Sequence, residues 1–294
     1  MDYINRLTLN IHQGKSALEC LQTDWRNLLL KISTPSLEQD WRWNFILADQ
    51  VFGSRYTVIS IYDNKELIAA FPLEEKKITR LGIPFRCLSN LTDDKLLDLS
   101  DALIHPDWKD KPILQVIKRH LASTKFDLIE FSEFTSRSSV AELPNDGWRF
   151  ELANHQNAYT LCSSPDDLKS LSKKHIKNIE RLSAKAEAEL GNIQLEILLG
   201  NQIKKSDIDD LVDIENSGWK AASGTSIYAS NTQNFYESAI QELSATNDAY
   251  IIFLKAADKR ISCALAFKAK NRLFLHKIAY RDETKEFDRE ILCY

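Results

Sequence analysis

Glycine and proline are scarce in this chain, and what is missing excludes several common nucleotide sites. The 294 residues include 8 glycines and 7 prolines; no glycine follows Gly224 and no proline follows Pro165. Neither the Gly-x-Gly-x-x-Gly pattern of a dinucleotide site nor the Gly-x-x-x-x-Gly-Lys-Ser/Thr pattern of a P-loop occurs anywhere. The absence of both patterns argues against these two classes of site.

Cysteine clusters and long apolar runs are missing as well. The five cysteines are scattered, with no Cys-x-x-Cys pair and no histidine close by, which is unlike a disulfide framework or a zinc site. The N-terminus lacks a basic region followed by an apolar run of signal length, and no stretch approaches the ~18 apolar residues of a membrane helix. We therefore expect a cytoplasmic protein with no metal site and no membrane span.

Neither sign of charge dominates. The 38 basic and 42 acidic residues give a formal net charge of −4 at pH 7, which provides no global attraction to DNA or to an anionic membrane. The 44% hydrophobic and 27% charged residues are typical of an ordinary soluble protein. The length suits about two domains, and we place the boundary near Asn154, which gives domains over 1–154 and 155–294.

The first half alternates helical and strand patterns. Ser36-Leu-Glu-Gln39 resembles a capping box that opens a second helix after Ser36, with Trp41 in its apolar row. Trp25, Trp41 and Trp43 are interpreted as core and rim residues. The other predicted elements are helices over 16–32 and 112–122, a hairpin of strands over 57–62 and 66–75, extended or loop segments over 81–90 and 96–104, and a buried strand over 126–131.

The second half is predicted to contain the longest helix. Ser164 suits its N-cap, Pro165 its first turn and Gly191 its end. The other predicted elements are strands over 158–162 and 193–199, helices over 206–216 and 232–243, and an antiparallel meander over 249–256, 261–268 and 272–280. Together the two halves predict an α+β fold with a mixed sheet that includes antiparallel strands.

The long helix carries many basic side chains. Such a surface could attract an anionic ligand, for example a phosphorylated cofactor, although a run of charge is more often a solvated helix face. The neighbouring His175 lies beside the apolar row, where a structural role is usual. The basic residues are Lys169, Lys173, Lys174, Lys177, Arg181 and Lys185.

The segment 215–236 lies between two predicted helices and combines an aromatic residue, a cation and many small polar groups. Trp219 and Lys220 stand beside Gly218, and hydroxyl residues gather around Gly224. Loops held on a rigid scaffold often carry function, so the segment is a candidate binding loop. A helix end anchored by tryptophan and followed by a surface loop is an equally good interpretation.

The order of motifs along nearly the whole chain resembles one family. Each motif is weak alone, but their order is moderately specific. The chain resembles the GNAT-type acetyltransferases found among bacterial cellulose and exopolysaccharide biosynthesis proteins. The matching residues are Trp41, 67–73, 172–179, 217–220 with Gly224 and Thr225, Phe235 with Tyr236, and 277–280.

This resemblance implies two GNAT-like acyl-CoA N-acyltransferase halves, as in the peptidoglycan-bridge aminoacyltransferases. It also implies transfer of an acyl group from acetyl-CoA or another acyl-CoA to an amine or hydroxyl of a small-molecule or saccharide acceptor, without a metal. In such enzymes the thioester lies against a splayed central strand, and backbone N–H groups at the next helix N-terminus hold the pyrophosphate. Catalysis is then mainly positioning, together with a base that removes the acceptor's proton.

The resemblance also implies roles for particular residues. Tyr280 or His276 would handle the proton, and Lys277 and Ile278 would contact the acyl-CoA. The substrate-binding candidates are Trp219 as a pocket wall, Lys220 for an anionic group, and Gly224, Thr225 and Tyr236. For each of these, packing or surface solvation remains an equally good interpretation.

The C-terminal residues depart from the family pattern. The family places a Pro-Gly segment soon after the position of Tyr280, whereas residues 285–294 contain neither residue and include Glu286, Asp288 and Glu290. Acidic side chains would repel a pyrophosphate. We therefore expect a second half that lacks its last elements and is truncated, completed by a second chain or no longer catalytic.

Two alternatives to acyl-CoA transfer follow. One is a non-catalytic GNAT-like module that binds a partner or serves as a scaffold. The other is an aminoacyl transferase that uses aminoacyl-tRNA, for which the basic helix over 165–190 is the only candidate RNA surface; the net charge of −4 weighs weakly against it.

Overall fold

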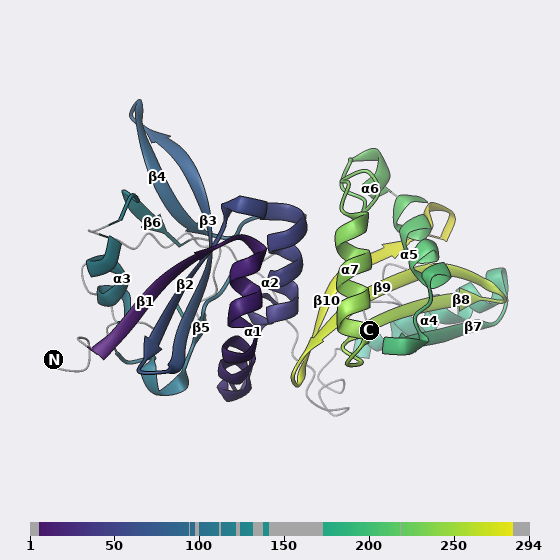
Figure 1. Cartoon of the computed structure of the whole chain (residues 1–294). Coiled ribbons are helices and arrows are strands. Elements are labelled where there is room, and N and C mark those ends of the chain that lie inside the picture. Colours follow the sequence, from purple (N-terminus) through teal and green to yellow (C-terminus); the bar gives the residue numbers. More distant parts are fainter. Residues whose placement is uncertain are drawn as a thin grey trace. The chain divides into compact units, whose positions relative to one another are not determined.

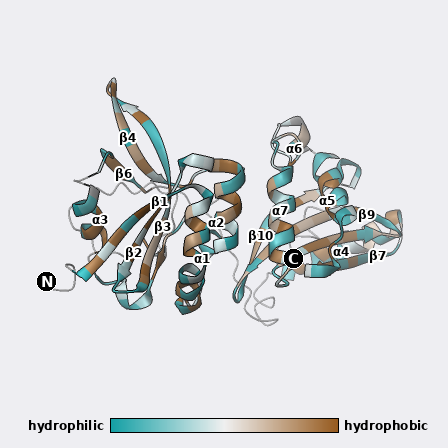
Figure 2. Cartoon of the chain, viewed as in Figure 1, coloured by the Kyte–Doolittle hydropathy of each residue, from teal (hydrophilic) through white to brown (hydrophobic). Residues whose placement is uncertain are grey.

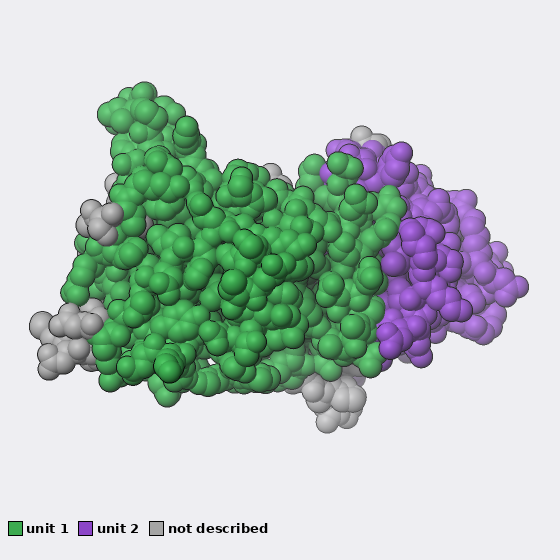
Figure 3. Space-filling model, viewed as in Figure 1, with its two compact units in different colours: residues 1–147, 231–249, 267–274 green, residues 148–230, 250–266, 275–294 purple. Residues whose placement is uncertain are grey.

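The computed structural model describes residues 6–93, 95–97, 100–111, 113–121, 124–131, 138–140, 173–217 and 219–284. They form two compact units, shown in Figures 1 and 3. Unit 1 comprises residues 1–147, 231–249 and 267–274, and unit 2 comprises residues 148–230, 250–266 and 275–294. The predicted strand over 158–162, the helix start at Ser164 and Pro165, and the boundary near Asn154 lie outside the described residues.

Unit 1 is built on a mixed sheet. Its main path runs in the order β1 (Leu7–Gln13), β2 (Tyr56–Asp63), β3 (Glu66–Arg80), β4 (Ile83–Asn90) and β6 (Leu128–Glu130). Neighbours from β1 to β4 are antiparallel, whereas β4 and β6 are parallel. The short β5 (Leu103–Ile104) pairs with the middle of β3. The predicted mixed sheet and the predicted hairpin across Asn64 are both confirmed.

Strand β3 is longer than its sequence pattern predicted. It spans 15 residues, and those from Leu67 to Glu74 are buried. Its first part pairs with β2 and its last part, from Leu73 to Arg80, pairs with β4. The outer part reads Lys-Lys-Ile-Thr-Arg, which is too polar for a core, and it extends with β4 as a two-stranded arm beyond the rest of the sheet (Figure 1).

The helices of unit 1 bury its tryptophans. They are α1 (Gly14–Lys31), α2 (Trp41–Leu47), α3 (Ile113–Leu121) and α7 (Gln233–Ser244). The indole N–H of Trp25 donates to the carbonyl of Gln39 at 2.9 Å, and that of Trp41 donates to the carbonyl of Leu18 at 2.8 Å. Trp43 packs edge-to-face on Phe235 of α7, with 4.9 Å between ring centroids. The three tryptophans are core residues, as predicted.

The start of α2 lies later than the sequence analysis placed it. The N–H of Ser36 does donate to the side chain of Gln39 at 3.0 Å, but only a 3₁₀ turn follows. The helix begins at Trp41, where the carboxylate of Asp40 accepts from the backbone N–H of Arg42 at 2.8 Å. Asp40 also pairs with the Arg42 guanidinium, so it caps the helix better than Ser36 does.

Unit 2 is built on the second sheet, in the order β10 (Arg272–Tyr280), β9 (Lys259–Ala269), β8 (Ala249–Ala256) and β7 (Ile193–Leu199). One end of each of three strands belongs to unit 1: residue 249 of β8, residues 267–269 of β9 and residues 272–274 of β10. Strands β8 to β10 follow one another through two-residue turns, which confirms the predicted meander, since only antiparallel neighbours can be joined so tightly.

The helices of unit 2 are α4 (Lys173–Leu190), α5 (Lys205–Ser217) and the short α6 (Trp219–Ala222). Helix α4 ends as predicted at Gly191, whose φ of 92° is open to glycine and whose N–H donates to the carbonyl of Glu187 at 3.1 Å. No helix among the residues that the structure describes is both long and apolar enough to cross a membrane.

Candidate functional site

The segment 215–230 of unit 2 is more ordered than a simple loop. After α5 the chain forms α6 and then turns at Gly224, whose φ is 73°. The N–H groups of Thr225 and Ser226 both donate to the carbonyl of Lys220, at 2.9 and 3.2 Å. Gly224 therefore provides the left-handed residue that ends a helical turn, and the exposed Thr225 lies just after it.

A buried ion pair lies beneath this segment. The Glu215 side chain is only 1% exposed, and its Oε2 accepts from the backbone N–H of Ile227 at 2.6 Å. The Nζ of Lys220 lies 3.3 Å from Glu215 Oε1 and donates to the carbonyl of Ile278 at 2.7 Å. The Glu215–Lys220 pair therefore connects α5 and the turn region to strand β10, and it brings together two of the predicted site residues, Lys220 and Ile278.

Strand β10 carries the predicted proton-handling residues. Because side chains alternate along a strand, His276, Ile278 and Tyr280 lie on one face and Lys277 lies on the other. The side chains of His276, Lys277, Ile278 and Tyr280 are all partly buried. In the described part of the sheet β10 is the terminal strand, with β9 as its neighbour. His276 and Tyr280 therefore share a partly buried face at a sheet edge.

The buried Cys263 lies close to the same strand. Its Sγ is 3.9 Å from the carbonyl of Leu211 in α5. Burial raises the pKa of the Cys263 thiol to about 12, and the negative charge of Glu215 acts in the same direction, whereas the charge of Lys220 and the N–H of Ala279 oppose it. The thiol is protonated at neutral pH, so it is a poor nucleophile there.

Two further predicted site residues lie on helices, Trp219 on α6 and Tyr236 on α7. The backbone of Trp219 belongs to α6, and its side chain lies outside the description. Tyr236 is a buried residue of α7 in unit 1, where its hydroxyl donates to the carbonyl of Lys95 at 3.3 Å and its ring packs edge-to-face on Phe235. The proposed roles of both residues stay predictions.

The basic residues of α4 extend along an exposed helix. Lys173, Lys174 and Lys177 are exposed. Arg181 donates to the side chain of Asn178 at 2.9 Å, and Lys185 pairs with Glu189 four residues later. Local pairs of this kind are typical of a solvated helix face, although they leave positive charge available to an anionic partner.

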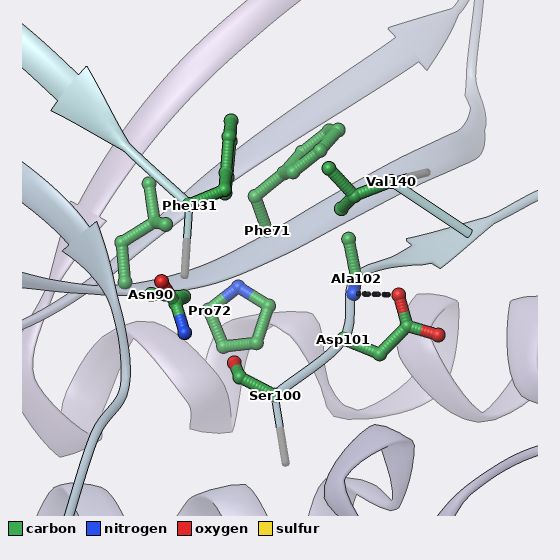
Figure 4. A pocket seen from close by; sticks show the side chains of 9 residues that line it. Phe71, Pro72, Asn90, Ser100, Asp101, Ala102, Phe131 and Val140 are labelled. Atoms are coloured by element: carbon green, nitrogen blue, oxygen red, sulfur yellow. Dashed lines mark hydrogen bonds between the residues drawn. The ribbon is translucent and has the colours of Figure 1, made fainter. Parts of the chain in front are cut away.

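The sequence analysis missed a second candidate site, a hollow in unit 1 (Figure 4). It lies where the parallel strands β4 and β6 end, at Asn90 and next to Phe131, and Phe71 of β3 and Val140 also line it. Its enclosed free volume is about 10 Å³, room for about one water molecule. Asp101 is the ionisable residue of this hollow.

The hydrogen bonds of Asp101 come from uncharged amides. Its Oδ1 accepts from the N–H groups of Ala102 and Ser139 at 2.8 and 2.9 Å, and its Oδ2 accepts from Gln39 Nε2 at 3.0 Å. Burial raises the pKa of Asp101 to about 7, although backbone N–H groups, including that of Val140, lower it. This carboxyl group can therefore exchange a proton near neutral pH, as a general base must.

Nothing in this second site stands out in the sequence. Asp101 is one of several acidic residues between 93 and 101, and no motif distinguishes it from the others. The hollow forms from β3, β4, β6 and the residues around Ser139, which are far apart in the chain. Among the described residues, no group of three or more histidine, cysteine, aspartate or glutamate side chains is arranged to hold a metal ion.

Comparisons with known proteins agree with this architecture. Residues 173–293 match the family described as the acetyltransferase (GNAT) domain. The crystal structure of FemX aligns with 98% of this chain and 84% of its own, at 12% identity and a TM-score of 0.58. The GNAT-like α+β fold predicted from the sequence is thereby confirmed.

Other solved structures are more distant. A tandem GNAT protein from the clavulanic acid biosynthesis pathway aligns with 97% of this chain and 83% of its own, at 10% identity and a TM-score of 0.42. An aminoglycoside acetyltransferase from an uncultured soil metagenomic sample aligns with 54% of this chain and 98% of its own, at 11% identity and a TM-score of 0.33. No curated protein matches the chain.

Proposed function

We propose that this protein transfers an acyl group from acetyl-CoA or a longer acyl-CoA to an amine or hydroxyl of a small molecule. The observation that carries the proposal is the match of residues 173–293 to the GNAT acetyltransferase domain. That segment contains β10, the Glu215–Lys220 pair and the turn at Gly224. The proposed place of the reaction is the cytoplasm, where acyl-CoA is made.

Strand β10 is the proposed acyl-CoA strand. In GNAT-type enzymes the thioester lies against a splayed central strand, and β10 carries the residues 277–280 on which the resemblance to that family rests. Lys277 and Ile278 are the proposed contacts. Because the carbonyl of Ile278 already accepts from Lys220, this part of the strand is held in one position before the substrate binds. Lys220 is thus proposed as a positioning residue, in addition to any contact with an anionic group.

The proposed chemistry is direct attack of the acceptor on the thioester carbonyl carbon. A base removes the proton from the attacking nitrogen or oxygen, and the thiolate leaves and takes up a proton. Tyr280 and His276 are the proposed proton-handling residues, because both lie on one partly buried face of β10. Trp219, Gly224 and Thr225 remain proposed acceptor contacts.

The test is a transfer assay that detects free CoA thiol with a panel of amines, amino sugars and alcohols, together with calorimetry of acyl-CoA binding. We expect Tyr280→Phe or His276→Gln to lower kcat by about 10²–10⁴-fold while acyl-CoA still binds. Tyr250→Phe, a partly buried tyrosine of β8 in the same sheet, is the matched control and should leave kcat unchanged. If millimolar acetyl-CoA and longer acyl-CoAs give no heat, the proposal is wrong.

An aminoacyl group carried by tRNA is the second candidate donor. The whole-chain fold likeness to FemX supports keeping it, and α4 offers the proposed basic surface. Replacing Lys173, Lys174 and Lys177 by glutamine should then weaken tRNA binding and flatten its dependence on salt. Purified protein that transfers from neither donor would instead favour the non-catalytic module. An acceptor in cellulose or exopolysaccharide synthesis rests on the sequence resemblance alone.

A further inference from the structure

None of the residues 76–86, which form the arm, is buried, although Arg86 at its base exchanges hydrogen bonds with Asp127 and pairs with Glu75. The arm runs from the pair Lys76 and Cys87 to the pair Arg80 and Ile83, and a two-residue turn closes it. Five residues per strand at ~3.3 Å each give a reach of roughly 17 Å. The arm stands out from the surface of unit 1 in Figure 3. Its sequence must therefore be explained by something other than core packing.

The turn residue at the tip is unusual for its position. Leu81 has a φ of 52° and Gly82 a φ of 80°, so both central residues of the turn have positive φ. Two-residue hairpin turns of this kind favour Asn, Asp or Gly, because a larger side chain is strained there. The β2–β3 turn of the same sheet follows that rule with Asn64, whose φ is 56°, whereas the two hairpin turns of the other sheet place Ala257 and Lys270 at positive φ. Leu81 is therefore not the residue that the backbone selects.

The side chain of Leu81 is also unfavourable for solvation. Leu81 is fully exposed, and Ile83 is 57% exposed. Ile83 shares a face of the arm with the cross-strand pair of Ile78 and Phe85, because side chains of paired residues lie together. Figure 2 shows the tip as hydrophobic. An aliphatic side chain that is both strained and exposed indicates a contact made outside the chain.

The charge of the arm points to the kind of partner. Residues 76–86 contain four cationic side chains and no acidic one, in a chain whose net charge is −4. Glu130 pairs with Arg80 at 3.2 Å and Glu75 pairs with Arg86 at 2.9 Å, which leaves the arm with a surplus of positive charge. Lys77 lies across from Arg86 in the hairpin. Arg80 therefore lies beside the apolar tip, and the other three cations lie nearer the base of the arm.

We propose that the β3–β4 arm docks on an anionic lipid bilayer, with Leu81 and Ile83 inserted among the lipids. Arg80 then lies nearest the headgroups, with Lys77, Arg86 and Lys76 further along the arm, and basic residues near the surface are attracted to anionic lipid. A nucleic acid would instead favour aromatic side chains for base stacking, whereas this tip is aliphatic. Two aliphatic residues and a few cations give weak, reversible attachment.

The test is co-sedimentation of the purified full chain with vesicles of phosphatidylcholine, with and without phosphatidylglycerol. We expect binding to the anionic vesicles that falls as salt is raised, and little binding to phosphatidylcholine alone. Leu81→Asn should lower vesicle affinity about tenfold and leave the melting temperature unchanged or higher, because Asn-Gly is a preferred sequence for this turn. The double variant Lys76→Gln with Lys77→Gln should lower affinity by a similar factor.

The matched control is Leu30→Asn, which removes another exposed leucine of unit 1, on α1 and outside the arm. Its vesicle affinity should equal that of the unchanged chain. The proposal is overturned if anionic vesicles do not sediment the protein, or if Leu81→Asn binds as well as the unchanged chain. It is also overturned if Leu30→Asn weakens binding as much as Leu81→Asn, or if arm variants lose binding to a nucleic acid or protein while no vesicle is bound.

Discussion

Two poorly exposed carboxyl groups, one in each unit, are held in opposite ways. Glu215 of unit 2 faces the ammonium group of Lys220 at 3.3 Å and accepts an N–H from Ile227. Asp101 of unit 1 accepts only from amide groups in the contacts described above, those of Ala102, Ser139 and Gln39. The first lies within an ion pair, and the second is a carboxyl group whose pKa is raised by burial to about 7.

The difference follows from what each charge gains on burial. Removing a carboxylate from water is costly, and a neighbouring cation offsets much of that cost, whereas amide dipoles offset less of it. The neutral acid is therefore favoured at Asp101 until the pH reaches about 7. Glu215 is therefore suited to holding Lys220, and through it strand β10, in position. Asp101 is suited to exchanging a proton.

The largest expected effect comes from breaking the ion pair. Lys220→Met should lower the free energy of unfolding of unit 2 by about 3–5 kcal/mol, because it leaves the carboxylate of Glu215 buried without its cation. Urea unfolding followed by tryptophan fluorescence and circular dichroism measures this. The double variant with Glu215→Gln should recover part of the loss, since no unpaired charge then remains.

The control for this comparison is Lys205→Met. Lys205 is an exposed lysine of α5 that pairs with the exposed Asp209, so its removal should cost less than about 1 kcal/mol. Equal stability of Lys220→Met and Lys205→Met would contradict the structural role of the buried pair. In that case a loss of acyl transfer in Lys220→Met would show that Lys220 acts on the substrate.

The strands of unit 2 could be predicted from the sequence, whereas the hollow around Asp101 could not, and the reasons are physical. The meander is set by local patterns: runs rich in β-branched and aromatic residues in β8 to β10 and turns such as Lys270–Asn271. The Glu215–Lys220 pair could not be predicted, because its members are five positions apart, outside the three- and four-residue spacings at which side chains meet on a helix. Asp101 depends on the parallel pairing of β4 with β6, which is non-local.

Helix α2 shows a limit of another kind. Ser36 and Asp40 are both good capping residues, and the sequence alone does not decide between them. The structure does, because Asp40 also holds the guanidinium of Arg42, which in turn pairs with Asp248 at 2.9 Å within unit 1. Arg42 and Asp248 are far apart in the sequence, so no local sequence pattern predicts their contact.

The pH dependence of stability gives the next largest effect. The folded-state pKa of Asp101 is raised above its unfolded value, so the folded state holds a proton that the unfolded state has released between about pH 4 and about pH 7. The Asp101 contribution to stability is greatest below that window and is lost as the pH rises through it. Asp101→Asn keeps a neutral side chain at every pH and should remove this term.

Urea unfolding at several pH values measures that term. The free energy of unfolding of Asp101→Asn, relative to the unchanged chain, should rise by about 3–4 kcal/mol from pH 4 to pH 8. Asp107→Asn, an exposed aspartate of the same unit, is the matched control and should show no such rise. A difference that does not change with pH would mean that Asp101 is ionised throughout, and its contrast with Glu215 would disappear.

The smallest effect reports on the charge of Glu215 itself, through its neighbour Cys263. Burial and that charge together raise the pKa of the Cys263 thiol to about 12, so alkylation by iodoacetamide at pH 8 should be at least ~100-fold slower than at the exposed Cys20. Glu215→Gln should raise the Cys263 rate a few-fold and shift its pH profile to lower pH. Peptide mass spectrometry follows each cysteine separately.

A faster rate alone would be ambiguous, because Glu215→Gln also weakens the pair with Lys220 and could open unit 2. The two causes differ in their pH dependence. Loss of the charge moves the profile of the still buried thiol by part of a pH unit, whereas opening exposes a thiol of ordinary pKa, about 8.5, so that the rate levels off above roughly pH 9. Cys87, buried in unit 1, should keep its rate in both cases. A profile that stays in place would mean that the Glu215 charge is too well neutralised by Lys220 to act on the thiol, and the ion pair would then be tighter than its 3.3 Å separation indicates.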